Sequence, residues 1–300
     1  MVYKTKTDPL IQIMIQIANV EKCDLMIYGG AQSGIWGLLV KRFLPQIRIK
    51  AVEANPNVFI KYYPKLSIQF DSYIHAALTT GHGIANFYVP DIRITKEKSN
   101  LRRVDEALFR RYHRERLRAE ESWCTTGSLH LDALRDKPEI INSKKMLVPK
   151  ITLEDLTENA DRILLFLDLQ GEDTFLLESL KPNIVEKLAV IHYEVEYIES
   201  DTIRRNSHEK TRELLISNGF ILFADDSVEG NMGFNELFVR KNSISIKNHF
   251  QWPSNDFMFD RETINEEISI MSRLRRLRVP GISVIGRLLS LLGIDVHKYR

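Results

Sequence analysis

The stretch that decides the fold runs from residue 25 to residue 43 and reads LMIYGGAQSGIWGLLVKRF. Leu25 to Ile27 is a short apolar run that leads directly into the glycine-rich segment Gly29 to Gly34. Apolar residues then recur at helical spacing, at Ile35, Trp36, Leu38, Leu39 and Phe43. A strand, a glycine turn and a helix in this order are typical of the first unit of a doubly wound α/β sheet.

Short apolar runs separated by helix-length segments continue along the chain, and each such run predicts a strand. We expect strands within residues 47–52, 67–78, 85–89, 163–169, 188–195, 220–223 and 237–240. Asp8 followed by Pro9 favours the start of a packed N-terminal helix over residues 9–20 rather than a secretion signal. The sequence therefore predicts an α/β fold with a mostly parallel sheet.

The pattern also predicts how the chain divides. We expect one domain over residues 1–245, interrupted by an insertion at 91–147, and a C-terminal appendage over 246–300. Within the insertion, residues 101–118 carry seven arginines against three acids. This segment is either a solvated helical insertion or a lid for an anionic substrate.

Composition narrows the class of protein. With 300 residues, 44% of them hydrophobic and 27% charged, the chain is long enough to bury a large core without disulfide or metal support. Cys23 and Cys124 match no zinc or redox spacing, and the chain has no N-x-[ST] acceptor for glycosylation. We therefore expect the protein to be located in the cytoplasm. No run of 18 apolar residues occurs, so no spanning helix is expected.

Charge is concentrated at the C-terminal end. Residues 271–300 carry seven Lys or Arg and one acid, which leaves the rest of the chain mildly acidic within a net charge of +2. An acidic body argues against nucleic-acid binding. Basic and apolar residues interleave in 271–300, so this segment is either a peripheral membrane or protein-binding element, or a docked helix pair with solvated arginines.

The glycine turn carries the first chemical signal. Bare backbone N–H groups at the start of a helix can face a negatively charged or hydroxyl-rich ligand. Glu53, 19 residues beyond Gly34 and at the end of the next predicted strand, can accept both hydroxyls of an adenosine ribose. Because no Gly-Lys-[ST] follows, a P-loop is excluded, but a relaxed dinucleotide fingerprint remains possible.

Carboxylates at strand ends carry the second signal. The apolar run from Ile163 ends at Asp168, which brings a carboxylate to the edge where open α/β sheets bind ligands. Glu194 shares a face of its strand with His192 by alternation, and His192 is more typical of a core residue than of a base. The eight histidines form no metal-ligand spacing, so no metal site is predicted.

Taken together, these motifs resemble the FkbM family of S-adenosylmethionine-dependent methyltransferases. The matching segments, over residues 24–241, are the glycine turn with Glu53, the segment TLEDL at 152–156, the strand end DLQGED at 168–173, and ELFVR at 236–240. The resemblance implies a class I methyltransferase-like Rossmann fold, with a seven-stranded, mostly parallel sheet whose last strand is antiparallel. It also implies methyl transfer from S-adenosylmethionine to a hydroxyl of a sugar or glycan-related small molecule.

The resemblance assigns roles to particular residues. Asp168 and Glu194 are the expected catalytic residues, and the expected cofactor-binding residues are Gly29, Gly30, Ala31, Gln32, Gly34, Glu53 and Asn55. The chain departs from the family pattern at Tyr28, which replaces an acid, at Gln32, which replaces Asn, and at Gln170, which replaces Glu. Two alternatives remain: an NAD(P)-dependent oxidoreductase, and a binding protein that keeps the methyltransferase fold without its activity.

Overall fold

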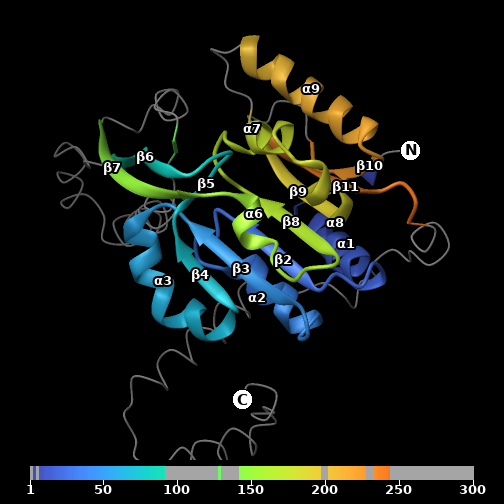
Figure 1. Cartoon of the computed structure of the whole chain (residues 1–300), viewed down its shortest axis with the longest axis horizontal. Helices are drawn as coiled ribbons and strands as arrows, with labels where there is room; N and C mark the ends of the chain where they lie inside the picture. The colour runs from blue at the N-terminus through green and yellow to red at the C-terminus, as the bar shows by residue number, and fades with distance from the viewer. Residues whose placement is uncertain are drawn as a thin grey trace, which may run out of the picture. The chain divides into compact units, whose positions relative to one another are not determined.

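A central sheet organises the chain (Figure 1). It is seen in a computed structural model that describes residues 3–4, 7–91, 128–129, 142–196, 202–227 and 233–243. Among these residues the sheet has eight strands. In spatial order they are β1 (Tyr3–Lys4), β10 (Phe220–Asp225), β11 (Gly233–Arg240), β9 (Leu188–Glu196), β8 (Ile163–Leu167), β2 (Leu25–Gly29), β3 (Arg48–Glu53) and β4 (Ser72–His75).

The strand directions confirm the predicted fold class. The run β4-β3-β2-β8-β9 is parallel throughout, whereas β11 is antiparallel to both β9 and β10. Seven strands, β2, β3, β4, β8, β9, β10 and β11, thus form a class I methyltransferase-like Rossmann sheet with an antiparallel last strand, whereas the strand predicted at 85–89 belongs to the second sheet. The two-residue strand β1 adds an eighth, parallel to β10.

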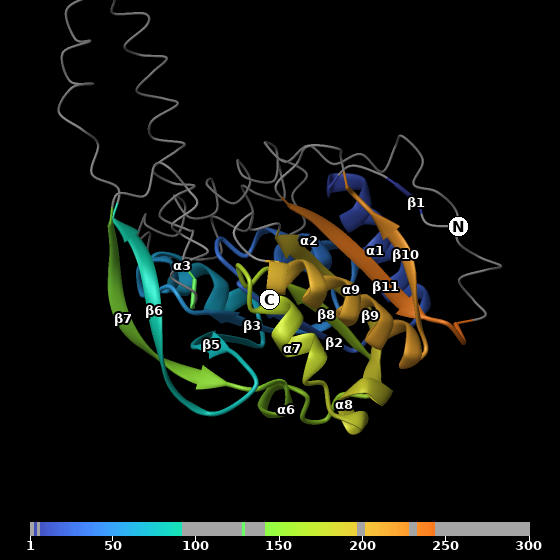
Figure 2. The same cartoon turned by 90° about the horizontal axis from the view of Figure 1, so that it is seen from above.

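The centre of the sheet is apolar because helices cover both faces. All five residues of β2 and all five of β8 are buried. On one face, β2, β8 and β9 pack against α7 (Asp173–Glu178) and α8 (Pro182–Lys187). On the other face, α1 (Thr7–Val20) contacts β9 and β11, and α2 (Ile35–Phe43) contacts β3. Figure 2 shows the two helical layers on opposite sides of the sheet.

A smaller second sheet stands beside β4. Its described strands are β5 (Ala77–Leu78), β7 (Asn142–Ile151) and β6 (Gly83–Asp91), in that order. Its core consists of Ala77, Phe87, Val89 and Val148. β6 and β7 are antiparallel neighbours, paired from Gly83 with Lys150 to Asp91 with Asn142.

The strand expected over 67–78 was wrong in extent. α3 (Pro56–Gln69) continues to Gln69, because Val58 and Leu66 are buried at helical spacing. The chain then forms β4, and Ala76 separates β4 from β5 where the backbone passes from the first sheet to the second. The N-terminal helix begins at Thr7, so Asp8 lies inside its first turn rather than at the cap.

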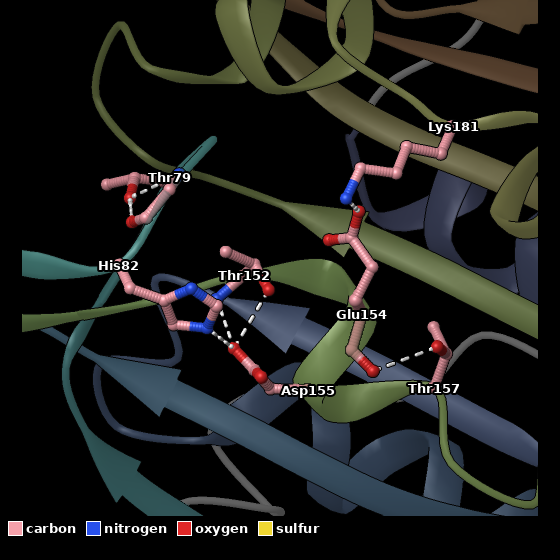
Figure 3. A network of polar contacts seen from close by, with 8 residues as sticks. Thr79, His82, Thr152, Glu154, Asp155, Thr157 and Lys181 are labelled. Carbon is pink, nitrogen blue, oxygen red and sulfur yellow. Dashed lines mark hydrogen bonds and ion pairs between the residues drawn. The ribbon is translucent and has the colours of Figure 1, made fainter.

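The TLEDL segment connects the two sheets. Thr152 and Asp155 form a capping box at the one-turn helix α6 (Leu153–Leu156), in which the Asp155 carboxylate accepts from the Thr152 backbone N–H at 2.9 Å. His82 Nε2, in the turn before β6, lies 2.8 Å from the same oxygen, and Figure 3 shows these contacts meeting there. Glu154 pairs with Lys181 on the other side of α6. The segment therefore fixes a junction between sheets and lies outside the cleft described below.

A buried carboxylate attaches α9 (Thr202–Ser217) to the sheet. Glu236 in β11 is fully buried, accepts from the Tyr193 hydroxyl at 2.6 Å and pairs with Arg212 of α9. His208, one turn earlier in α9, is also buried beside Tyr193. Because a buried charge is costly unless it is paired, this cluster specifies where α9 packs.

Several predicted features lie outside the described residues. They are the C-terminal appendage from residue 246 onward, with its basic segment 271–300, the arginine-rich segment 101–118, and Cys124. Ser128–Leu129 and the first residues of β7 lie within the expected insertion 91–147 and belong to the described structure. Cys23 is buried, and burial raises the pKa of its thiol to about 12. Among the described helices, none has the length and apolar character needed to cross a membrane.

Gly37 tests how closely α2 packs on the sheet. A Cβ atom there would lie 2.7 Å from Phe70 Cζ and 3.1 Å from Tyr28 Cδ1. Alanine favours a helix interior over glycine by about 1 kcal/mol, but overpacking costs about 1 to 3 kcal/mol. We therefore expect Gly37→Ala to lower the free energy of unfolding in urea. Gly81→Ala is the control, since its Cβ would meet no atom within 4 Å. A stabilised Gly37→Ala variant would contradict this packing.

Candidate functional site

The glycine turn after β2 is shaped by a close approach to the end of β8. Gly30 has a φ of +70°, and a Cβ atom there would lie 1.9 Å from the backbone oxygen of Asp168. Gly34 has a φ of +74° and caps the N-terminus of α2, with Leu66 packed against it. Both positions therefore require glycine. The turn brings backbone from two neighbouring strands together at the carboxyl edge of the sheet.

Glu53 lies beside this turn at the end of β3. Its side chain is buried, with 4% of its surface exposed. One carboxylate oxygen accepts from the backbone N–H of Gln32 at 2.8 Å, and the other accepts from that of Asn55 at 2.7 Å. Each oxygen keeps a further lone pair that can accept from a ligand hydroxyl.

Burial changes the ionisation of Glu53. Desolvation raises the pKa of its carboxyl from 4.5 to about 7. The backbone N–H groups of Asn55 and Gln32 oppose this rise, and the charge of Asp168 adds to it. Glu53 therefore titrates near neutral pH and ionises more readily when a ligand donates hydrogen bonds to it.

An open cleft runs past Glu53. Its walls are the glycine turn at Gly30 and Gln32, the ends of β3 and β5, and the loop after β8. Phe87 of β6 and Leu129 add an apolar wall from the second sheet. Three acids line the cleft, namely Glu53, Asp168 and Glu172, and no Lys, Arg or His does so among the described residues.

The two expected catalytic carboxylates are joined by one amide. Gln170 Nε2 donates to Asp168 Oδ1 at 2.9 Å and to Glu194 Oε2 at 2.9 Å. Asp168 and Gln170 follow β8 and line the cleft, whereas Glu194 belongs to β9 and is not part of the cleft wall. The structure thus brings Asp168 and Glu194 together through a residue that the sequence marked only as a departure from a family pattern.

The loop after β8 is held by two further groups. Ser128 Oγ donates to the backbone oxygen of Gln170 at 2.8 Å, and Ser128 is paired with Tyr88 of β6 through two backbone hydrogen bonds. Asp173, which is buried, accepts from the backbone N–H of Leu169. Asp173 therefore supports the loop from within, and the loop is also tied to the second sheet.

Not every expected site residue lines the cleft. Gly30, Gln32, Glu53 and Asp168 do. Asn55 is fully buried, and its side-chain oxygen caps α3 by accepting from Asn57 at 3.0 Å. Gly29, Ala31 and Gly34 shape the turn without being part of the cleft wall, and Ala31 is fully buried.

Sequence reasoning missed four residues of this region: Gln170 as a bridge, Ser128 as a support, and Phe87 and Leu129 as an apolar wall. No local sequence pattern indicates these contacts, because they join residues that are far apart in the chain.

Tyr28, His192 and His75 are not part of the cleft wall. Tyr28 is buried, packs edge-on against Phe166 at 5.0 Å, and its pKa is raised well above its usual value by burial. His192 is fully buried and stacks on Phe166 at 4.3 Å, and burial lowers its pKa to about 4. His192 is therefore a neutral core residue, as predicted. His75 stacks on Phe59 and is not part of the cleft wall.

The Glu53 carboxyl predicts a pH dependence of stability. Its pKa is about 7 in the folded chain against 4.5 for the free group. Between these values the folded state binds more protons than the unfolded state, so the stability that protonated Glu53 contributes is lost as pH rises through 7. Glu53→Gln lacks this loss. We therefore expect the free energy of unfolding of Glu53→Gln, relative to that of the parent, to increase by up to about 3 kcal/mol as the pH rises from 4.5 to 8.

Urea unfolding of both proteins at pH 5, 6, 7 and 8 measures this difference. Glu158→Gln, at an exposed position, is the control and should run parallel to the parent. Parallel curves for Glu53→Gln would mean that Glu53 is ionised normally.

Comparisons with known proteins give structural likenesses alone. No protein-family model matches the chain, and no curated protein sequence matches it. Among solved structures, the precorrin-6y C5,15-methyltransferase of Geobacter metallireducens GS-15 is similar at 10% identity and a TM-score of 0.37, over 80% of this chain and 94% of that one.

Human N-acetylserotonin methyltransferase in complex with SAM is similar at 11% identity and a TM-score of 0.30. That likeness covers 77% of this chain and 51% of the human enzyme, so the chain spans about half its length. A spermidine synthase in complex with the transition state analogue AdoDATO is similar at 10% identity and a TM-score of 0.32, over 97% of this chain and 78% of that one.

Proposed function

We propose that the chain is an S-adenosylmethionine-dependent O-methyltransferase that acts on a hydroxyl of a sugar or glycan-related small molecule. The position of the Glu53 carboxylate is the main support for this proposal. Its buried carboxylate lines the cleft beside Gly30, and each of its oxygens is already oriented by a backbone N–H. A nucleoside ribose presents two neighbouring hydroxyls, which match the two oxygens of such a carboxylate.

The charge of the cleft supports this cofactor over a dinucleotide. S-adenosylmethionine carries a sulfonium and an ammonium group, whereas NAD(P) carries a negatively charged pyrophosphate. The described residues that line the cleft include Glu53, Asp168 and Glu172 and no basic side chain. An acidic cleft favours the cation and opposes the pyrophosphate. For this reason the NAD(P)-dependent oxidoreductase is the weaker hypothesis.

The residues of this chain would divide the work as follows. When bound, the cofactor supplies a methyl group on a sulfonium, which is already a good leaving group. Gly30 leaves the backbone bare for close approach, and Glu53 holds the ribose. Asp168, with Glu194 joined to it through Gln170, would orient the acceptor hydroxyl and remove its proton. Alignment and general-base assistance are then the contributions of the protein.

A second function is favoured by one observation. Tyr28 takes the place of an acid at the end of β2 and is buried against Phe166. A chain that lost this acid could bind the nucleoside without transferring a methyl group. The experiments below separate this binding protein from the enzyme.

Glu53 gives the first test of the proposal. Loss of charge-assisted hydrogen bonds costs about 1.5 to 3 kcal/mol. Glu53→Ala should therefore weaken S-adenosylhomocysteine binding by about one to two orders of magnitude in calorimetric titration. In the parent, the affinity should rise with pH from 5.5 to about 7.5, because the ionised carboxylate is the better acceptor. A proton should be released on binding near pH 6.5.

Parallel titrations with S-adenosylmethionine and NAD identify the cofactor. Glu158→Ala, at an exposed position, serves as the control and should bind like the parent. Tighter binding of NAD than of S-adenosylmethionine would overturn the proposal in favour of the oxidoreductase. Equal affinity in Glu53→Ala and the parent would remove Glu53 from the binding site.

Asp168 gives the second test. If its carboxylate takes the hydroxyl proton, Asp168→Asn should lower methyl transfer by about 10² to 10⁴ while the melting temperature barely moves. Formation of S-adenosylhomocysteine from S-adenosylmethionine, in the presence of each member of a panel of sugars and glycan precursors, measures the reaction. Near-normal turnover with reduced stability would instead make Asp168 a structural residue. Binding of the cofactor without turnover on any acceptor in the parent would favour the binding protein.

A further inference from the structure

Gln170 connects two carboxylates that come from different strands. Its side-chain amide has two hydrogens, and the nitrogen lies 2.9 Å from Asp168 Oδ1 and 2.9 Å from Glu194 Oε2. Since both acceptors are carboxylates, the amide nitrogen rather than the amide oxygen must face them. Each hydrogen is therefore directed to a different acid, and the donor lies between the two negative charges.

The backbone at Gln170 is held in an uncommon conformation. Its φ is +53°, in the left-handed region that side chains other than glycine rarely adopt. Ser128 Oγ donates to the Gln170 backbone oxygen at 2.8 Å, which ties this conformation to the second sheet through Tyr88. A strained backbone beside a cleft, fixed by a residue 42 positions away, indicates that the placement of this side chain matters.

We propose that Gln170 is a positioning residue whose amide takes the place of a divalent cation, holding Asp168 and Glu194 together at the end of the cleft. The inference deepens the proposed function and rests on it where it concerns catalysis. The convergence of the three side chains depends only on the two hydrogen bonds of the Gln170 amide.

Charge explains why an amide suits this position. Two carboxylates that share a site repel each other, and a donor between them relieves that repulsion. A divalent cation would also relieve it, but a divalent cation binds oxygen ligands. The Gln170 amide presents N–H donors at this point instead. Replacing the amide with a third carboxylate removes the donor and supplies the missing ligand. Gln170→Glu should therefore turn the bridge into a site for a hard cation.

The experiment measures Mn²⁺ binding through the electron paramagnetic resonance signal of the free ion. We expect Gln170→Glu to bind one Mn²⁺ at least tenfold more tightly than the parent. The matched control is Gln46→Glu, which makes the same charge change at an exposed position. It should bind no better than the parent. The double variants Gln170→Glu with Asp168→Asn, and Gln170→Glu with Glu194→Gln, should each lose the gain.

Failure of the double variants to lose the gain, or no gain in a folded Gln170→Glu, would overturn the inference. If Gln170→Glu does not fold, Mn²⁺ binding by the parent tests the inference. Parent binding that is abolished by Asp168→Asn would contradict the inference. Retention of turnover by the parent in excess chelator would support it. Ser128→Ala keeps the amide but loosens its backbone, and should lower kcat about three- to tenfold with little change in KM for the cofactor.

These readouts separate the inference from the proposed function. Mn²⁺ binding requires neither cofactor nor acceptor. A Gln170→Glu variant that gains the ion, in a chain that binds no S-adenosylmethionine, would leave the bridge intact and refute the methyltransferase. A chain that binds the cofactor and methylates an acceptor, without the gain in Mn²⁺ affinity, would refute the bridge alone.

Discussion

Gly30 lies so close to the end of β8 that the backbone oxygen of Asp168 occupies the place a Cβ atom would need. The rest of the site depends on this contact. It brings the turn after β2 against the loop after β8, where the Asp168 N–H donates to the Gly29 oxygen at 3.1 Å. With the two loops fixed in this way, the N–H of Gln32 reaches Glu53 on one side of the turn. On the other side Asp168 meets Gln170.

Negative charge is the second constraint on the cleft. Glu53 is buried near Asp168, and a carboxylate there is costly unless donors compensate it. Two backbone N–H groups supply part of that compensation, and the remaining cost is seen in a pKa raised to about 7. A ligand that brings hydroxyls or a positive charge removes the rest. The cleft is therefore poised to gain more from a cationic nucleoside than from an anionic one.

The parts of the site that could be predicted are those that parallel strands bring together automatically. Glu53 and Asp168 each follow an apolar run, and the carboxyl ends of parallel strands meet at one edge of the sheet. What the sequence could not indicate depends on contacts between distant residues. Ser128 bonds to Gln170 across 42 positions, and no local pattern marks that pair. The length of α3 was also missed, because the β-branched and aromatic residues around Ile68 favour a strand until Leu66 is seen to pack on Gly34.

Tyr28 supports the glycine turn by packing rather than by charge. Its ring fills the space between Phe166 and the first residues of α2, and Gly37 allows α2 to approach that ring. Burial raises the pKa of the Tyr28 hydroxyl, and the backbone N–H of Trp36, near the N-terminus of α2, opposes that rise. The shape of the glycine turn therefore depends on Gly30 and Gly34. Tyr28 brings no carboxylate to this region, so the negative charge of the cleft is carried by Glu53, Asp168 and Glu172, which line the cleft itself.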